Sequence, residues 1–123
     1  MSPEKISNGH HIILDLYGCD QQLLNNYDQL YTMMKNALEL ANATVLKVSG
    51  EKFEPQGVTI FALLAESHCS IHTWPEIGYC AVDFYTCGTK TKSQAAVNYL
   101  TTALNAHKAT QKDFTRYAFA VAK

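Results

Sequence analysis

The segment HCSIHTWPEIGYCAVDFYT, residues 68–86, predicts the centre of the fold. The runs 68–73 and 79–86 are rich in the residue types that favour β-strands. The five residues between them, 74–78, contain a proline and a glycine and therefore predict a turn. We expect these two runs to form an antiparallel hairpin.

Further strands are predicted on both sides of this hairpin. Apolar residues alternate at 12–17, with the two-residue period of a strand. Residues 44–53 and 57–65 are β-rich runs divided by a turn, and the second is apolar enough to be buried on both faces. A last strand is expected at 114–121.

Two segments have apolar residues at every third or fourth position, which predicts amphipathic helices. The first covers residues 21–41, with Asp20 as its N-cap, and the second covers residues 93–107. An apolar sheet face needs a cover, and the helices supply it. The sequence therefore predicts an α+β fold, a two-layer sandwich in which two α-helices cover one face of an antiparallel β-sheet.

The composition indicates one compact domain, residues 1–123. The chain is 47% hydrophobic and 17% charged, which suits a single core. Ten Lys and Arg residues against eleven Asp and Glu residues give no reason to expect a nucleic acid or an anionic membrane as partner. No apolar run reaches the roughly 20 residues that span a bilayer, and the first residues do not resemble a secretion signal. We expect a cytoplasmic protein.

Histidines and cysteines gather around the hairpin, which raises the question of a metal site. His68 and His72 lie four residues apart, with Cys69 between them and Cys80 and Cys87 following. On a strand the two histidines project to one face and Cys69 to the other. The chain has neither an H-E-x-x-H helix nor a paired-cysteine knuckle, so we expect no metal.

The four cysteines match no C-x-x-C pair and are better interpreted as free thiols than as a disulfide framework. We expect Cys19, Cys69 and Cys80 to be buried and unreactive. Cys87 belongs to the candidate site described below.

A serine hydrolase is a further candidate, with Ser67 or Ser70 as nucleophile and a histidine as base. The chain lacks a G-x-S-x-G elbow, and spacing alone does not identify the third group of a triad. A structural role would be the simplest interpretation of any one of these side chains. The structural interpretation is weaker here because several titratable groups lie in one hairpin. Burying such groups together has a desolvation cost, and proteins usually bear this cost only at a functional site.

Several longer segments of the chain stand out by their order and spacing. They are ESH (66–68), IHTWPE (71–76), GY (78–79), Asp83 and TCG (86–88), flanked by GHH (9–11), LYGCD (16–20) and FEPQGVT (53–59). These segments resemble the central signature of the prokaryotic-type (class 1) S-adenosylmethionine decarboxylases, a pyruvoyl-dependent family, and the similarity covers residues 9–105.

This resemblance implies that the chain cuts itself between Glu66 and Ser67. In the family the serine hydroxyl attacks the preceding carbonyl, the amide becomes an ester, and elimination leaves a pyruvoyl group. A β chain of residues 1–66 and an α chain of residues 67–123 would stay together through their shared sheet.

Two further residues are implied to act in this processing. His72 matches the histidine that transfers protons during the cut. Thr59 matches a hydroxyl residue, commonly serine, that stabilises the oxyoxazolidine intermediate, and its additional methyl group bears on the processing rate.

The implied activity is decarboxylation of S-adenosylmethionine to S-adenosylmethioninamine, the aminopropyl donor for spermidine synthesis. The pyruvoyl group would hold the substrate amine as a Schiff base and accept electrons from the α-carbon, without pyridoxal phosphate. Cys87 is implied to return a proton to that carbon. Proton delivery to the cofactor carbon instead would convert the pyruvoyl group to alanine.

The resemblance also assigns the substrate-binding side chains. Glu76 resembles the carboxylate that accepts the ribose hydroxyls, and Phe53 resembles the aromatic residue that stacks on adenine. Trp74 is close enough in sequence to add a second aromatic wall, and rings also suit a sulfonium cation. The alternative for Phe53 and Trp74 is an ordinary place in the core.

The family implies a homodimer of processed protomers, with two sites near the interface that draw on both copies. Two alternatives stay open at this point. A pyruvoyl-dependent decarboxylase of ornithine or arginine would keep Ser67, His72 and Cys87, although Glu76 argues against it. An unprocessed, non-catalytic paralogue would have no use for the intact Glu66-Ser67 pair.

Overall fold

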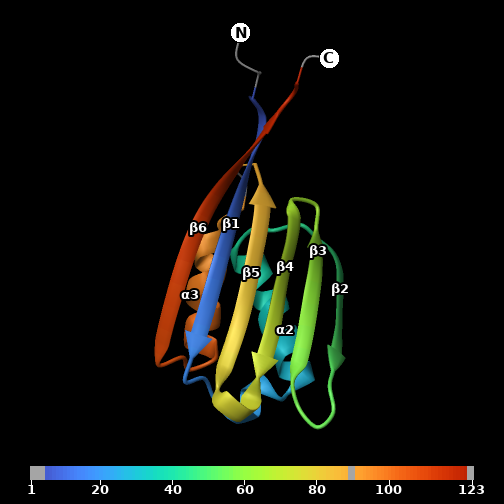
Figure 1. The fold of residues 1–123 in the computed structure, drawn as a ribbon. Coiled ribbons are helices and arrows are strands. Elements are labelled where there is room, and N and C mark those ends of the chain that lie inside the picture. The colour runs from blue at the N-terminus through green and yellow to red at the C-terminus, as the bar shows by residue number, and fades with distance from the viewer. Residues whose placement is uncertain (1–4, 89–90, 122–123) are drawn as a thin grey trace.

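A six-stranded antiparallel sheet with helices on one face forms the molecule (Figure 1). The computed structural model describes residues 5–88 and 91–121. The strands follow one another across the sheet in the order β2-β3-β4-β5-β1-β6. They are β1 (Lys5–Tyr17), β2 (Val45–Lys52), β3 (Val58–Leu64), β4 (Ser67–Trp74), β5 (Tyr79–Cys87) and β6 (Lys108–Phe119).

The second layer lies behind the sheet in Figure 1 and consists mainly of helices α2 and α3. The helices are α1 (Gln21–Leu24), α2 (Tyr27–Leu40) and α3 (Ser93–Ala103), and a 3-10 turn, η1 (Pro75–Ile77), joins β4 to β5. The predicted α+β two-layer sandwich is confirmed, and so is the hairpin, in which Ser67 pairs with Thr86 and Trp74 with Tyr79.

The single helix predicted over residues 21–41 is wrong, because the chain forms two helices there. Asn26 has an extended backbone, and its side chain accepts a hydrogen bond from the Gln29 N–H at 3.1 Å. It is therefore the N-cap of α2 and ends the preceding turn. Asp20 caps α1 as predicted, accepting a hydrogen bond from the Gln22 N–H at 2.9 Å.

The edge strand β6 and its neighbour β1 are both longer than predicted. β6 begins at Lys108 instead of residue 114, and β1 begins at Lys5 instead of residue 12. The strands pair from Tyr17 and Lys108 at one end to Lys5 and Phe119 at the other. Most side chains of β6 are exposed, so backbone pairing defines this strand and no alternating burial marks it in the sequence. The helix predicted over 93–107 ends at Ala103.

The two faces of the sheet differ in burial. On β3, Val58, Ile60, Ala62 and Leu64 are buried under the helices, whereas Phe61 and Leu63 are 43% and 44% exposed on the other face. The prediction that this strand is buried on both faces is therefore wrong for the single chain. We call the uncovered side, which carries Thr59, Phe61, His68, His72 and Tyr85, the open face.

Three of the four thiols are buried, as predicted. Cys19, Cys69 and Cys80 are free and buried, whereas Cys87 is half-buried. Burial raises the pKa of Cys19 to about 11, and it raises the pKa values of Cys69 and Cys80 as well. Within residues 5–88 and 91–121, no helix has the length and apolar character needed to cross a membrane.

Candidate active site

The predicted cut lies where β4 begins, beside the end of β5. The backbone N–H of Cys87 donates a 3.0 Å hydrogen bond to the carbonyl oxygen of Glu66. This carbonyl is the one that the Ser67 hydroxyl would attack. A fixed N–H donor at such an oxygen stabilises the negative charge that develops when a nucleophile adds to the carbonyl carbon.

The backbone at the cut is strained on one side and anchored on the other. Ser67 has a φ angle of 156°, a conformation that costs a residue with a side chain about 1–3 kcal/mol. The Glu66 carboxylate accepts a hydrogen bond from the Thr44 N–H at 3.0 Å. Glu66, Ser67 and Cys87 are thus held together, and we call them the junction cluster.

Five other predicted residues come together in a separate place. Thr59 pairs with His72 across β3 and β4, and Thr59 Oγ1 lies 3.0 Å from His72 Nδ1. Both line a cavity of about 260 Å³ near the turn that joins β4 to β5. The complete lining is Phe53, Gln56, Gly57, Thr59, His72, Thr73, Trp74 and Glu76. We call Thr59, His72, Phe53, Trp74 and Glu76 the pocket cluster.

The aromatic walls of this pocket face solvent in the single chain. Phe53 is 47% exposed and Trp74 is 43% exposed, so neither is a core residue. Trp74 packs against Tyr79, with ring centroids 5.2 Å apart. Glu76 is exposed in η1. The pocket therefore presents two rings and a carboxylate that a ligand can reach.

One residue of the pocket lining, Thr73, has a buried hydroxyl that holds neighbouring segments together. It was not identified as a site residue from the sequence. Thr73 Oγ1 donates to the Leu24 carbonyl oxygen at 2.7 Å and accepts from the Val58 N–H at 2.9 Å. The Gly57 N–H donates to Asn25 Oδ1 at 3.0 Å. These bonds join α1, β3 and β4. Thr73 lies inside the signature segment, which was the only sign of its role.

The junction cluster and the pocket cluster lie at opposite ends of β4. Ser67 is the first residue of this strand, and His72 follows five residues later. An extended strand rises roughly 3.3 Å per residue, so the two residues are about 17 Å apart. No serine or histidine side chain spans that distance. One chain alone therefore does not bring His72 to the cut, contrary to a simple interpretation of their closeness in the sequence.

Between the clusters, rings from successive strands form a band across the open face. The ring centroids of Phe61 and His68 are 5.6 Å apart, those of His68 and Tyr85 are 5.9 Å apart, and those of Tyr85 and His11 are 5.5 Å apart. Asp83 Oδ1 lies 3.6 Å from His11 Nε2. Among the described residues, no group of three or more His, Cys, Asp or Glu side chains could hold a metal ion.

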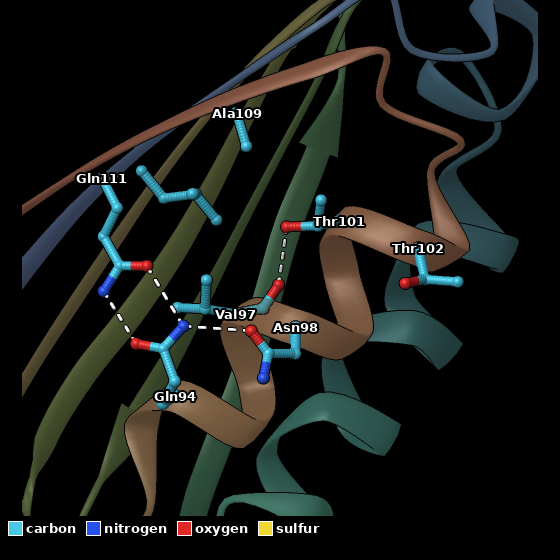
Figure 2. Close-up of a pocket in the computed structure, with 8 residues that line it drawn as sticks. Gln94, Val97, Asn98, Thr101, Thr102, Ala109 and Gln111 are labelled. Atoms are coloured by element: carbon cyan, nitrogen blue, oxygen red, sulfur yellow. Dashed lines mark hydrogen bonds between the residues drawn. The ribbon is translucent and has the colours of Figure 1, made fainter.

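A larger hollow, of about 360 Å³, lies on the helical side between α3 and β6 (Figure 2). Two of the residues that line it, Gln94 and Gln111, exchange hydrogen bonds of 3.2 Å and 2.8 Å through their side-chain amides. Gln94 also donates to Asn98 at 3.0 Å. None of the predicted catalytic or substrate-binding residues lines this hollow, so we place the candidate site on the open face.

Comparisons with known proteins show which family the chain resembles. The family model described as S-adenosylmethionine decarboxylase matches residues 10–117. An S-adenosylmethionine decarboxylase proenzyme of Prochlorococcus marinus is 50% identical over 108 residues, which is 88% of this chain and 86% of that protein. The corresponding proenzyme of Pyrobaculum islandicum is 48% identical over 101 residues, 81% of each chain.

A solved structure extends the likeness to three dimensions. The adenosylmethionine decarboxylase of Aquifex aeolicus superposes with a TM-score of 0.82 at 36% identity, over 95% of both chains. The likeness therefore covers the sheet and the helical layer together. The chain belongs to the S-adenosylmethionine decarboxylase family.

Proposed function

We propose that this protein decarboxylates S-adenosylmethionine with a pyruvoyl group that it makes by cutting itself between Glu66 and Ser67. Family membership supports the reaction and the substrate. The observation that carries the cut is the hydrogen bond from the Cys87 N–H to the Glu66 carbonyl, beside the strained backbone of Ser67.

The chain's own groups account for the cut. Ser67 Oγ adds to the Glu66 carbonyl carbon while the Cys87 N–H stabilises the oxyanion. The amide nitrogen then leaves as an amine, and the acyl group remains on the serine oxygen as an ester. Loss of the Ser67 α-proton expels the Glu66 carboxylate, and water replaces the nitrogen of the resulting residue, releasing ammonia and leaving the pyruvoyl group.

The sheet suits a chain that is cut at this point. β3 lies before the cut and pairs with β4, which lies after it. β1 lies before the cut and pairs with both β5 and β6. A β chain of residues 1–66 and an α chain of residues 67–123 would therefore remain one folded unit without the covalent link.

The residues around the cut fit a pyruvoyl group at position 67. The Cys87 N–H already points at the neighbouring carbonyl, and the same residue carries a half-buried thiol. The carbonyl of the pyruvoyl group supplies the electron sink for decarboxylation. Cys87 then donates a proton to the substrate's α-carbon.

The pocket cluster fits the rest of the substrate. Phe53 and Trp74 offer ring faces to adenine and to the sulfonium cation. The Glu76 carboxylate accepts hydrogen bonds from the ribose hydroxyls. Thr59 and His72, joined by their 3.0 Å contact, complete this half of the site.

We infer that a second copy of the chain completes the site, as a homodimer packed through the open faces. A two-fold axis running between two such sheets, across the strands, reverses the strand direction in the second copy. The junction cluster of each copy then lies opposite the pocket cluster of the other. The exposed Phe61 and Leu63 on the open face would be buried in this dimer.

Denaturing mass spectrometry tests the cut. Wild-type protein should separate into fragments 1–66 and 67–123, whereas Ser67→Ala should remain one chain. Ser70→Ala is the matched control, because Ser70 lies on the same strand away from the cut, and it should separate normally. Separation of Ser67→Ala, or a wild-type chain that never separates, would refute the proposed cofactor.

Carboxyl-labelled substrates test the reaction. Processed protein should release labelled carbon dioxide from S-adenosylmethionine and not from ornithine or arginine. Glu76→Gln should raise the KM for S-adenosylmethionine about tenfold, because a charged acceptor of the ribose hydroxyls is lost. Release from ornithine or arginine alone would show that the substrate assignment is wrong.

A further inference from the structure

We propose that Tyr85 is a positioning residue for Cys87, with its hydroxyl seated over Gly9 to orient the thiol and to return a proton to it after each turnover. This inference rests on the proposed role of Cys87 as the proton donor. It adds a residue that neither the sequence signature nor the chemistry described above requires.

The position of the Tyr85 hydroxyl depends on the absence of a side chain at Gly9. A Cβ atom at Gly9 would lie 2.1 Å from Tyr85 Oη and 2.7 Å from Cζ, so the phenol occupies the space that a side chain would need. Gly9 is paired directly with Cys87 across β1 and β5. Side chains of paired residues are about 5 Å apart at Cβ, which places the hydroxyl beside the Cys87 sulfur.

The phenol is held in this place from several sides. Arg116, which pairs with Gly9 from β6, lies over the Tyr85 ring with its guanidinium carbon 5.4 Å from the centroid. The His11 and His68 rings flank it at 5.5 Å and 5.9 Å. Together with Cys87, these are the charged and titratable side chains in contact with the phenol among the described residues. Such contacts restrict the ring to one orientation.

The interaction with the Cys87 side chain favours the neutral phenol. It raises the pKa of Tyr85, with a smaller contribution from burial, while Arg116 acts in the opposite direction. A protonated phenol next to the sulfur is a hydrogen-bond donor toward a thiolate. Tyr85 therefore keeps its proton and offers a hydrogen bond to the sulfur at the moment when Cys87 lacks a proton.

The proton balance of the reaction requires such a step. When the Cys87 thiol gives its proton to the α-carbon, a thiolate remains. The Tyr85 O–H passes its proton to that sulfur as its oxygen takes one from solvent water, so the phenol stays neutral. Each carbon dioxide released thus takes up one proton from solvent, and no other reactant is needed.

A poorly oriented thiol favours the wrong outcome. If the proton goes to the cofactor carbon, the substrate's amino group stays at position 67 as alanine, and water releases the decarboxylated substrate as an aldehyde. The number of turnovers before this inactivation measures how well Cys87 delivers its proton. That number therefore reports on Tyr85 more directly than the rate alone.

A titration that needs no activity tests the contact. In uncut Ser67→Ala protein with ¹³Cζ-labelled tyrosine, the Tyr85 signal is identified by its absence in Tyr85→Phe. Adding Cys87→Ala should lower the pKa of Tyr85. The control signal is Tyr99, which accepts a hydrogen bond from Asn36 at 3.1 Å on the helical side and should not move. An unchanged Tyr85 titration would overturn the proposed contact.

The processed enzyme tests the consequence. Tyr85→Phe should cut itself normally and keep its KM, but the ratio of product formed to alanine-ended α chains should fall about tenfold, as expected for loss of one hydrogen bond to a charged group. Gly9→Ala should give the same fall, because its Cβ displaces the phenol. The double variant should be no worse than either, and Tyr99→Phe should match wild type.

The outcomes separate this inference from the proposed function. If wild-type protein has no pyruvoyl group or releases no carbon dioxide from S-adenosylmethionine, the proposed function fails. If wild type is active and Tyr85→Phe shows the wild-type ratio of product to alanine-ended chains, the proposed role of Tyr85 is refuted and the proposed function stands. Should Gly9→Ala not fold, the Tyr85→Phe result still decides.

Discussion

At the scale of single residues, Cys87 contributes to the site through two separate groups. Its backbone N–H donates to the Glu66 carbonyl, whereas its side chain is a half-buried thiol. The first group remains in any variant at this position except proline. Processing and proton donation can therefore be separated by changing the side chain alone.

Cys87→Ala should accordingly process like wild type and then fail in catalysis. We expect the decarboxylation rate to fall at least about 100-fold, the loss typical of a missing general acid, with alanine accumulating at position 67. Time courses of carbon dioxide release and the mass of the α chain measure both effects. Cys80→Ala, a change at a buried thiol on the other face, should keep processing and activity. A Cys87→Ala chain that stays uncut would contradict the separation.

At Thr59, substitutions can separate the effect of the hydroxyl group from the effect of side-chain shape. Thr59→Val keeps the shape and removes the hydroxyl that lies 3.0 Å from His72 Nδ1, so self-cleavage should slow about tenfold or more. Thr59→Ser keeps the hydroxyl and should process at least as fast as wild type. The fraction of cut chain against time after synthesis gives both rates. Equal rates for the valine variant and wild type would exclude Thr59 from processing.

At the scale of elements, the break between α1 and α2 shows what the sequence could and could not indicate. The apolar periodicity of residues 21–41 continues through Asn25 and Asn26, and it therefore predicted one helix. The capping bond from the Gln29 N–H to Asn26 Oδ1 depends on a local backbone conformation that periodicity does not report. The break also frees Asn25 to hold the Gly57 N–H at the pocket.

The N-cap of α2 gives a stability prediction. Asn26→Ala should lower the free energy of unfolding by about 1 kcal/mol, the usual cost of losing a capping side chain. Urea unfolding of the uncut Ser67→Ala protein measures it without interference from the cut, and the m value should not change. Thr32→Ala, an exposed position within α2, should stay within about 0.5 kcal/mol. An equal effect of the two substitutions would show that Asn26 does not cap the helix.

Among the strands too, some features could be predicted from the sequence and others could not. The β4–β5 hairpin could be predicted because its turn residues and strand residues agree. β3 was predicted to be buried on both faces because Phe61 and Leu63 are as apolar as their neighbours. In the single chain only the helical side covers this strand, and a sequence does not distinguish a face covered by its own helices from one left for a second copy.

At the scale of the whole molecule, the sequence suggested candidate site residues, but their spatial grouping could not be predicted from it. Residues 66–76 are adjacent in the chain, yet β4 is extended and separates Ser67 from His72 by about 17 Å. Neighbours in the sequence thus become opposite ends of a strand. In the proposed dimer their pairing depends on assembly, which composition and periodicity do not encode.

Mixed dimers test this assembly directly. Cys87→Ala removes the proton donor from the junction cluster, and Glu76→Ala removes the ribose acceptor from the pocket cluster. If each site takes its junction from one copy and its pocket from the other, a mixed dimer has one site with both defects and one intact site. With random pairing, half of the dimers are mixed, so co-expression should restore about a quarter of wild-type activity.

Control combinations of the same variants should show no rescue. Neither variant alone should show this activity, and a chain carrying both substitutions should not be rescued by either single variant, because every site then contains at least one defect. If each site instead lay within one copy, every site in the mixed dimer would carry a defect, and co-expression would restore nothing. Two different affinity tags allow the mixed dimer to be purified. Its carbon dioxide release decides between the two arrangements. With one intact site of two, the mixed dimer should have half the activity of a wild-type dimer.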